Sequence, residues 1–268
     1  ANQRSGRAGR TGPGKCFRLY TELAFKNEMF ANTIHQIQRK NLRNVILMLK
    51  AIGINDLLHF EFMDPPPKES ILLSLNELYY LKAVDDQSRI TTIGRNLVNI
   101  PAHPTISKTL IESIHYKCSD EMITIFAVLS TPNIFNRPKQ QQELADKKKA
   151  RFHHPHGDHL TYLNVFNAWV NNDYSKQWCQ DNFIQERSLK KAQDVRNQLI
   201  QIFKRFKYPI ISCGANTNAV RKALCAGFFK NIAKRDAQDG YKTLAEETQV
   251  YIHPSSSLRN SPQYVVYN

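Results

Sequence analysis

The chain has 268 residues, enough for one to three domains with a sizeable hydrophobic core. Lysine and arginine together number 37 against 23 acidic residues, a formal net charge of +14 that favours a polyanionic partner, nucleic acid before an acidic membrane surface. The five cysteines are scattered singly, which argues against a zinc ribbon and for reduced thiols inside a cell, and no apolar run is long enough to span a membrane.

The first ten residues carry a pattern suited to phosphate binding. Arg4, Arg7 and Arg10 recur at three-residue spacing, and their guanidinium groups are planar, permanently charged donors for phosphate oxygens. Glycines between them allow close backbone approach, and Gln3 can orient a water molecule. We interpret this stretch as part of a phosphoryl-transfer site, where arginine stabilises charge developing on a γ-phosphate. The alternative is a disordered basic arm.

The next hundred residues predict a winged helix. Alternation over residues 15–20 predicts a short strand that leaves the preceding domain. From about residue 32, apolar spacing predicts the first helix of the winged helix, which Gly53 ends. A second helix follows three prolines, and a hairpin at 83–91 leads to a short helix after Thr92. The inward positions expected for the first two helices are Leu42, Val45, Ile46 and Leu49, then Ile71, Leu72, Leu75 and Leu78. The second helix is not basic on its outer face, so direct reading of a DNA groove is disfavoured.

Residues 101–207 predict a bundle of helices. Apolar stripes at helical spacing mark four of them, beginning near Ile106, Met122, Leu160 and Leu189. The last is the longest, with a stripe that continues to Phe206 over about five turns. Its other face is basic, and we interpret most of those side chains as solvated.

The period changes after Pro209. A short helix is expected from 218 to 226, ending at Gly227, followed by strands at 228–233, 241–244, 249–253 and 264–267 with Asp239-Gly240 as a hairpin turn. Short strands interleaved with basic residues predict a small barrel that binds single-stranded nucleic acid, incomplete because the chain stops on a strand-like segment. The candidate RNA contacts are Lys230, Lys234, Arg235, His253 and Ser255.

The histidine-rich segment at 153–159 is the most metal-like cluster. Zinc requires four converging ligands at fixed geometry, and the spacing around His156 and His159 does not supply them. Asp158 is better placed to cap a helix that begins near His159. We therefore predict no metal site.

These motifs resemble those of DEAH-box RNA helicases. The order from Gln3 to Arg10 resembles the sixth motif of that family, in which the glutamine and the second and third arginines face the nucleotide; here these are Gln3, Arg7 and Arg10. Further blocks resemble the C-terminal region of the spliceosomal members, at residues 53–58, 60–66, 118–122, 135–139, 157–161, 227–229 and 252–256.

The resemblance implies an α+β multidomain fold. The expected order is the end of a second RecA-like domain with the sixth motif (1–24), a winged helix (25–100), a helical-bundle ratchet domain (101–207) and an incomplete oligonucleotide-binding (OB) fold (208–268). Neither G-x-x-x-x-G-K-[ST] nor Asp-Glu-Ala-His occurs in the sequence, so we expect the first RecA-like domain to lie outside this chain.

The resemblance also implies an activity for the intact protein. It would be a nuclear, ATP-dependent RNA helicase of pre-mRNA splicing, acting in mRNA release and spliceosome disassembly. Gln3 would position the attacking water while Arg7 and Arg10 stabilise the γ-phosphate, with ATP and Mg²⁺ held largely by the other domain. This chain alone is expected to be inactive and to bind no cofactor.

The implied partners are single-stranded RNA and spliceosomal proteins, with no membrane. A glycine-rich activator motif is a further candidate partner for Met63-Asp64-Pro65 and the winged-helix surface. Two other functions stay open at this point: a non-catalytic RNA-binding or protein-docking module, and a DEAH-box helicase of ribosome assembly.

Overall fold

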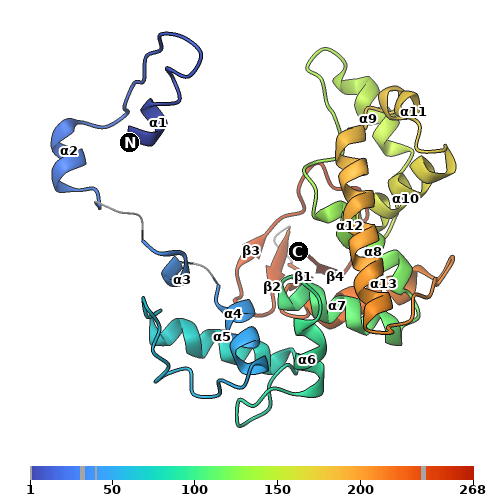
Figure 1. Ribbon diagram of the computed structural model, residues 1–268. Coiled ribbons are helices and arrows are strands. Elements are labelled where there is room, and N and C mark those ends of the chain that lie inside the picture. Colours follow the sequence, from blue (N-terminus) through green and yellow to red (C-terminus); the bar gives the residue numbers. More distant parts are fainter. Residues whose placement is uncertain (1, 31–33, 40, 237–239) are drawn as a thin grey trace. The chain divides into compact units, whose positions relative to one another are not determined.

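The computed structural model describes residues 2–30, 34–39, 41–236 and 240–268 (Figure 1). The chain divides into two compact units. The first comprises residues 1–40 and 62–66, and the second comprises residues 41–61 and 67–268. In the part of the chain that the structure describes, no helix is long and apolar enough to cross a membrane.

The first unit contains short helices joined by irregular segments: α1 (Asn2–Ser5), α2 (Glu22–Asn27) and α3 (Gln36–Arg39). The hydroxyl of Thr21 caps α2 by accepting a hydrogen bond from the Ala24 N–H at 3.1 Å. The strand expected at 15–20 is wrong, because those residues pair with no strand among the described residues. Alternation favours a strand only where a partner satisfies its backbone groups.

The second unit begins with the helices and hairpin expected of a winged helix: α4 (Arg43–Ala51), α5 (Lys68–Tyr80) and α6 (Thr92–Val98). Gly53, at φ +101°, follows the end of α4, where only glycine is unstrained. The hairpin is reduced to a single bridge between Val84 and Ile90. Thr91 caps α6 by accepting from the Gly94 N–H. The order of elements is confirmed, while the winged-helix assignment stays a prediction.

The buried faces of α4 and α5 match the expected ones in part, since Leu42, Ile46, Ile71 and Leu78 are buried as predicted. Val45 and Leu72 were expected inside, yet they are 40% and 54% exposed, whereas Leu47 and Ser74 are buried. Both helices carry apolar residues on more than one face. Periodicity therefore predicts the helix, but packing against the neighbouring helices decides its rotation.

The bundle contains all four expected helices and two further ones, within the described residues. The six are α7 (Pro104–His115), α8 (Ser119–Leu129), α9 (Gln142–Ala150), α10 (Asp158–Asn171), α11 (Lys176–Asp181) and α12 (Glu186–Arg205). The stripe of α12 is confirmed, since Leu189, Ala192 and Phe203 are fully buried. The α12 side chains pack against α8, whose Met122 and Ile123 are also fully buried.

Helix α13 (Thr217–Phe228) packs in the core of the bundle, although it was assigned to the region after residue 207. Val220, Ala223 and Leu224 share one hydrophobic cluster with Leu110 of α7. Gly227 lies inside the helix and does not end it. A Cβ atom added there would lie 1.9 Å from the Thr109 Oγ1 atom and 2.6 Å from a backbone oxygen, both on α7. Glycine therefore allows α13 to approach α7 closely.

We expect Gly227→Ala to destabilise the chain by about 1–3 kcal/mol, because the added methyl group overpacks the contact with α7. Alanine's higher helix propensity, worth about 1 kcal/mol, offsets part of this loss. Thermal unfolding measures the change. Gly12→Ala is the control, because a Cβ at Gly12 meets nothing within 4 Å. Equal stability of the Gly227→Ala variant and the native chain would contradict the close packing.

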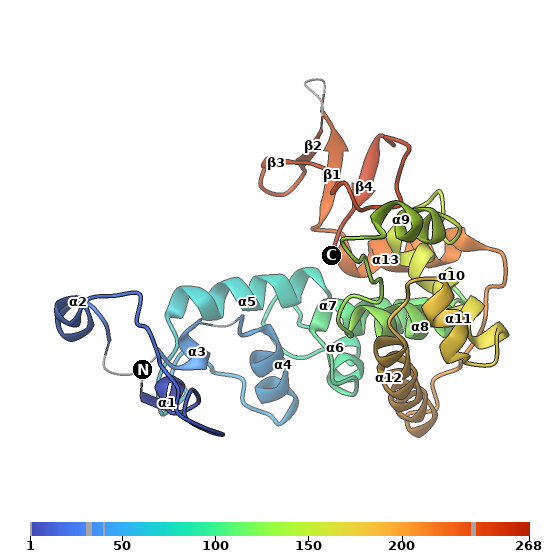
Figure 2. The same ribbon diagram turned by 90° about the horizontal axis from the view of Figure 1, so that it is seen from above.

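The last sixty residues include a four-stranded antiparallel sheet in the order β3-β2-β1-β4. Figure 2 shows α13 leading from the bundle into this sheet. The strands are β1 (Ile232–Arg235), β2 (Tyr241–Thr243), β3 (Gln249–Val250) and β4 (Tyr264–Val266). The predicted start of the first strand, at residue 228, is wrong, because Phe228 is the last residue of α13. The other three predicted strands are confirmed as β2, β3 and β4, each shorter than expected. In the expected hairpin turn, Asp239 lies outside the described residues.

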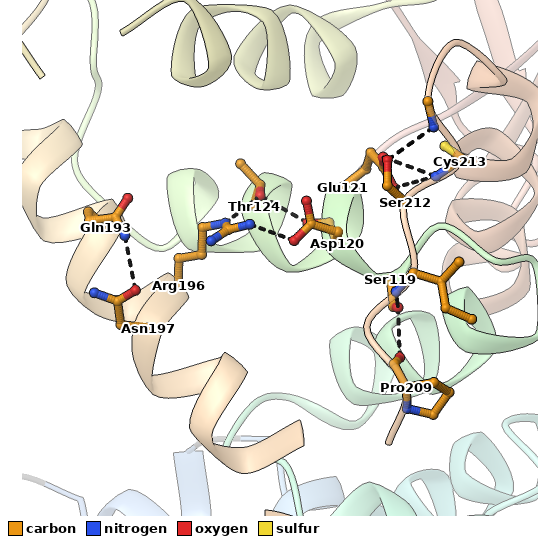
Figure 3. Close-up of polar contacts among 12 residues, drawn as sticks. Ser119, Asp120, Glu121, Thr124, Gln193, Arg196, Asn197, Pro209, Ser212 and Cys213 are labelled. Carbon is orange, nitrogen blue, oxygen red and sulfur yellow. Dashed lines mark hydrogen bonds and ion pairs between the residues drawn. The ribbon is translucent and has the colours of Figure 1, made fainter. Parts of the chain in front are cut away.

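The beginning of α8 holds the segment that joins α12 to α13 (Figure 3). The Ser119 hydroxyl donates to the Pro209 carbonyl oxygen at 2.9 Å. The buried carboxylate of Glu121 accepts from the Ser212 hydroxyl and from the Cys213 N–H. Residues 118–122 were noted for their resemblance to the helicase family, and these contacts assign that block a structural role.

Candidate nucleic-acid interface

The N-terminal candidates lie in the first unit. Gln3 belongs to α1, and Arg7 and Arg10 follow it in a series of turns, in which the Arg7 N–H donates to the Arg4 carbonyl at 3.2 Å. The side chains of Gln3, Arg7 and Arg10 are exposed. Exposed guanidinium groups on a turning backbone can reach the oxygens of a phosphate group presented by another domain.

The five candidate RNA contacts do not form one patch, and Lys230 is the most enclosed of them. Its ammonium group lies 4.9 Å from the centre of the Tyr80 ring and 3.8 Å from the Glu77 carboxylate, both on α5. Glu77 also pairs with Arg43 at 2.8 Å. Lys230 therefore links the sheet region to α5, and its charge is partly offset.

A cavity of about 530 Å³ lies beside this ion network. Arg43, Glu77, His103 and Lys230 contribute to its lining, together with Thr243 of β2 and residues 267–268. Burial lowers the pKa of His103, and the nearby charge of Arg43 lowers it further. The imidazole of His103 is therefore neutral at physiological pH. The two cations that line the cavity, Arg43 and Lys230, already have Glu77 as their acidic partner.

Lys234 and Arg235 lie on opposite faces of the sheet, because successive residues of a strand alternate. Lys234 is paired in register with Lys242 and Tyr264. The Arg235 N–H donates to the Gln263 carbonyl at 2.8 Å. The side chains of these two neighbours therefore leave the sheet in opposite directions.

His253 and Ser255 lie in a loop that contacts α9. The Nδ1 atom of His253 is 2.8 Å from the Ser255 hydroxyl oxygen. The Ser255 carbonyl oxygen accepts a hydrogen bond from Lys149 Nζ at 2.6 Å, and the same ammonium group lies 4.9 Å from the centre of the Phe135 ring. The loop is thus held by a cation from the bundle.

Asp158 fastens the same loop to the start of α10, which corrects its expected role as a cap. The N-cap of α10 is Gly157, and Asp158 is the first helical residue. Its carboxylate accepts from the Ser257 N–H at 2.7 Å and from the Ser256 hydroxyl at 2.6 Å. Thr161 Oγ1 bonds to the Ser257 hydroxyl at 2.9 Å. We call Asp158, Thr161, Ser256 and Ser257 the serine latch.

The serine latch brings together two blocks that are far apart in the sequence. Burial alone would raise the pKa of Asp158, but hydrogen bonds from Ser256 and Ser257 outweigh it and hold that pKa below its ordinary value. The carboxylate is therefore ionised at neutral pH, and each of its two bonds to the loop is charge-assisted.

The neighbouring histidines act as packing residues. Among the described residues, no group of three His, Cys, Asp or Glu side chains is arranged to hold a metal ion. Burial lowers the pKa values of His153, His154 and His159, so these rings are neutral at physiological pH. The three residues are partly buried, and the His154 ring packs against that of His156, with the ring centres 5.3 Å apart.

Sequence reasoning missed Lys149 and Arg259, which lie beside the loop. Burial is the main cause of the lowered pKa of Lys149, and the positive charge of Arg259 contributes. Arg259 is exposed. The only sequence signal was the run of lysines at 147–149, whose proximity to residue 255 no local pattern predicts. Lys149 and Arg259 both lie near His153, whose pKa their positive charges help to lower.

Two parts of the chain match known domain families. Residues 103–162, from α7 into α10, match the helicase associated domain (HA2), which is ratchet-like. Residues 220–268, which include all four strands, match the oligonucleotide/oligosaccharide-binding (OB)-fold. These matches confirm the ratchet and partial OB-fold expectations.

The chain is 50% identical over 270 residues to the pre-mRNA-splicing factor ATP-dependent RNA helicase prp22 of Schizosaccharomyces pombe (strain 972 / ATCC 24843). The similarity covers 100% of this chain and 23% of that helicase. Together with the two domains, it fits the C-terminal region of a DEAH-box RNA helicase, which confirms the resemblance found in the sequence.

Proposed function

We propose that this chain acts as part of a nuclear, ATP-dependent RNA helicase of pre-mRNA splicing. The observation that carries the proposal is the 50% identity, along the whole chain, to a splicing RNA helicase. The chain spans 23% of that relative's length, so the activity of the whole protein is inferred from the relative. Its partners would be single-stranded RNA and spliceosomal proteins, and its step would be mRNA release and spliceosome disassembly.

In this proposal the first unit contributes to ATP hydrolysis. Arg7 and Arg10 offset the charge that develops on the γ-phosphoryl group, and Gln3 orients the attacking water. ATP and Mg²⁺ would be held mainly by another domain, because the sequence contains no G-x-x-x-x-G-K-[ST] motif. The isolated chain is therefore expected to show no RNA-stimulated ATPase activity.

The second unit would contact the RNA backbone. Lys234, Arg235 and the loop around His253 and Ser255 are the proposed contacts, and Arg259 adds a cation beside the loop. Lys230 would have to exchange its contact with Glu77 to join them. Phosphate contacts of this kind position RNA without reading its sequence. A glycine-rich activator is a proposed protein partner, for which Met63 offers a side chain that is 99% exposed.

A salt series tests the RNA contact. The purified chain is titrated with a short labelled single-stranded RNA, and fluorescence anisotropy gives the affinity at each salt concentration. We expect binding to weaken steeply with salt, and Arg259→Ala to reduce the slope of log K against log salt by about 0.7. Lys191→Ala, at an exposed lysine of α12, is the control and should leave the slope unchanged.

Two results would count against this proposal. Absence of binding at low salt would mean that other domains carry the affinity for RNA. The bundle and sheet would then be a docking module, the other class of function that the sequence leaves open. An Arg259→Ala slope equal to that of Lys191→Ala would remove the loop from the RNA path.

A further inference from the structure

One face of the sheet carries a row of side chains that crosses all four strands. The register places Lys242 between Gln249 and Lys234, and it places Lys234 beside Tyr264. Directly paired residues point to the same face of a sheet. We call Gln249, Lys242, Lys234 and Tyr264 the lysine–tyrosine row, and all four of its residues are exposed.

The opposite face of the sheet supplies its packing. Ala233, Tyr241 and Thr243 alternate with the row residues, and they are 0%, 4% and 5% exposed. The Tyr241 hydroxyl donates to the Pro262 carbonyl at 2.9 Å, which anchors the loop before β4. The lysine–tyrosine row is therefore dispensable for the core, and its composition needs another explanation.

The charges of the row favour a polyanion. Lys234 and Lys242 are directly opposite each other, an arrangement that destabilises an isolated sheet. Glu247 lies 3.0 Å from Lys242 and offsets one of the two charges. A negative group lying over β1 would offset the charge of Lys234.

Tyr264 adds a feature that simple anion binding does not use. It is 51% exposed and occupies the register position next to Lys234. Sites for single-stranded nucleic acid combine cations that follow the backbone with aromatic rings on which bases stack. An acidic peptide would satisfy the lysines but would leave the ring without a matched partner.

We propose that the lysine–tyrosine row is a binding subsite for single-stranded RNA, in which a base stacks on Tyr264 and the adjoining phosphate contacts Lys234. This subsite deepens the proposed RNA-binding function and rests on it. Stacking does not depend on the identity of the base, so the subsite takes RNA of any sequence. The RNA of this subsite lies on the face of the sheet that carries Lys234, whereas Arg235 points to the other face.

The test compares an ordinary RNA with one of equal length that lacks its bases. Tyr264→Leu is expected to weaken binding of the ordinary RNA about tenfold and to leave binding of the abasic strand unchanged. Tyr264→Phe keeps the ring and should bind as the native chain does. Lys234→Ala should weaken both strands and reduce the salt slope by about 0.7, whereas Lys191→Ala should change neither.

Other results of this experiment would contradict either the proposed RNA contact as a whole or the subsite alone. If the native chain binds no RNA at low salt, the proposed RNA contact fails together with this subsite. If the native chain binds but Tyr264→Leu binds equally well, only the subsite fails. Equal weakening of both strands by Tyr264→Leu would exclude stacking, and displacement of RNA by a glutamate-rich peptide at equal concentration would favour an acidic protein partner. Thermal unfolding of each variant should match that of the native chain, because these side chains are exposed.

Discussion

Replacing Asp158 with alanine is expected to destabilise the chain by about 2–3 kcal/mol, as measured by thermal or denaturant unfolding. The substitution removes two charge-assisted hydrogen bonds and leaves the N–H of Ser257 without its acceptor. Ser257 is 2% exposed, so water cannot easily replace the lost carboxylate. Of the bonds in the serine latch that join the loop to α10, only the one between Thr161 and Ser257 would remain.

Asp146→Asn is the matched control for this prediction. Asp146 also pairs with a cation, Arg137 at 2.8 Å, but both side chains are more than half exposed. Exposed ion pairs contribute little, so the control should change stability by less than about 1 kcal/mol. Similar losses in the two variants would mean that the serine latch contributes no more than a surface ion pair.

The pH dependence of stability follows from the same carboxylate. The folded-state pKa of Asp158 is lowered, so the native state binds this proton less readily than the unfolded state does. The contribution is fully present above the unfolded value and is lost as the pH falls through the folded value. The stability of Asp158→Asn should therefore fall less steeply with acidification than that of the native chain, and parallel pH profiles would contradict this linkage.

In an intact helicase that contains this chain, Arg10→Ala is expected to lower the rate constant of ATP hydrolysis by about a thousandfold or more. An arginine that stabilises the phosphoryl transition state contributes an effect of this size. The kcat for ATP hydrolysis at saturating RNA is the measurement. RNA affinity should stay unchanged, because the proposed RNA contacts lie in the second unit.

Arg4→Ala is the control, since it removes the same charge from the same segment, at the arginine that the family pattern does not place at the nucleotide. We expect a much smaller loss of kcat for that variant. Equal losses in the two variants would indicate that the segment acts through its net charge, and no specific role would remain for Arg10.

Local pattern was sufficient where the physical signal is local. The twenty-residue helix α12 follows from one apolar stripe, because residues three and four apart share a helix face. Gly53 was predicted to end α4, and its positive φ agrees with the turn that glycine alone adopts without strain. The order of the main parts of the chain was therefore predictable: two helices, the hairpin at 83–91, the helical bundle and the sheet.

Local pattern failed where a partner decides the outcome. Val45 and Leu72 have the spacing of buried residues but are exposed, because packing against the neighbouring helices decides which apolar side chains of a helix are covered. The segment 15–20 alternates like a strand but has no partner strand among the described residues. Gly227 was predicted to end a helix, whereas it lies inside α13 against α7.

The sequence by itself therefore determined most of the helices, three of the strands in the sheet, the resemblance to the C-terminal region of DEAH-box helicases and the positive charge that favours a polyanion. Only the tertiary structure decided which side chains meet. Asp158 and Ser256 are 98 residues apart in the chain, and no periodicity or capping rule connects positions at that separation. Likewise, Lys234 and Arg235 are neighbours in sequence, but the alternation of a paired strand places them on opposite faces of the sheet.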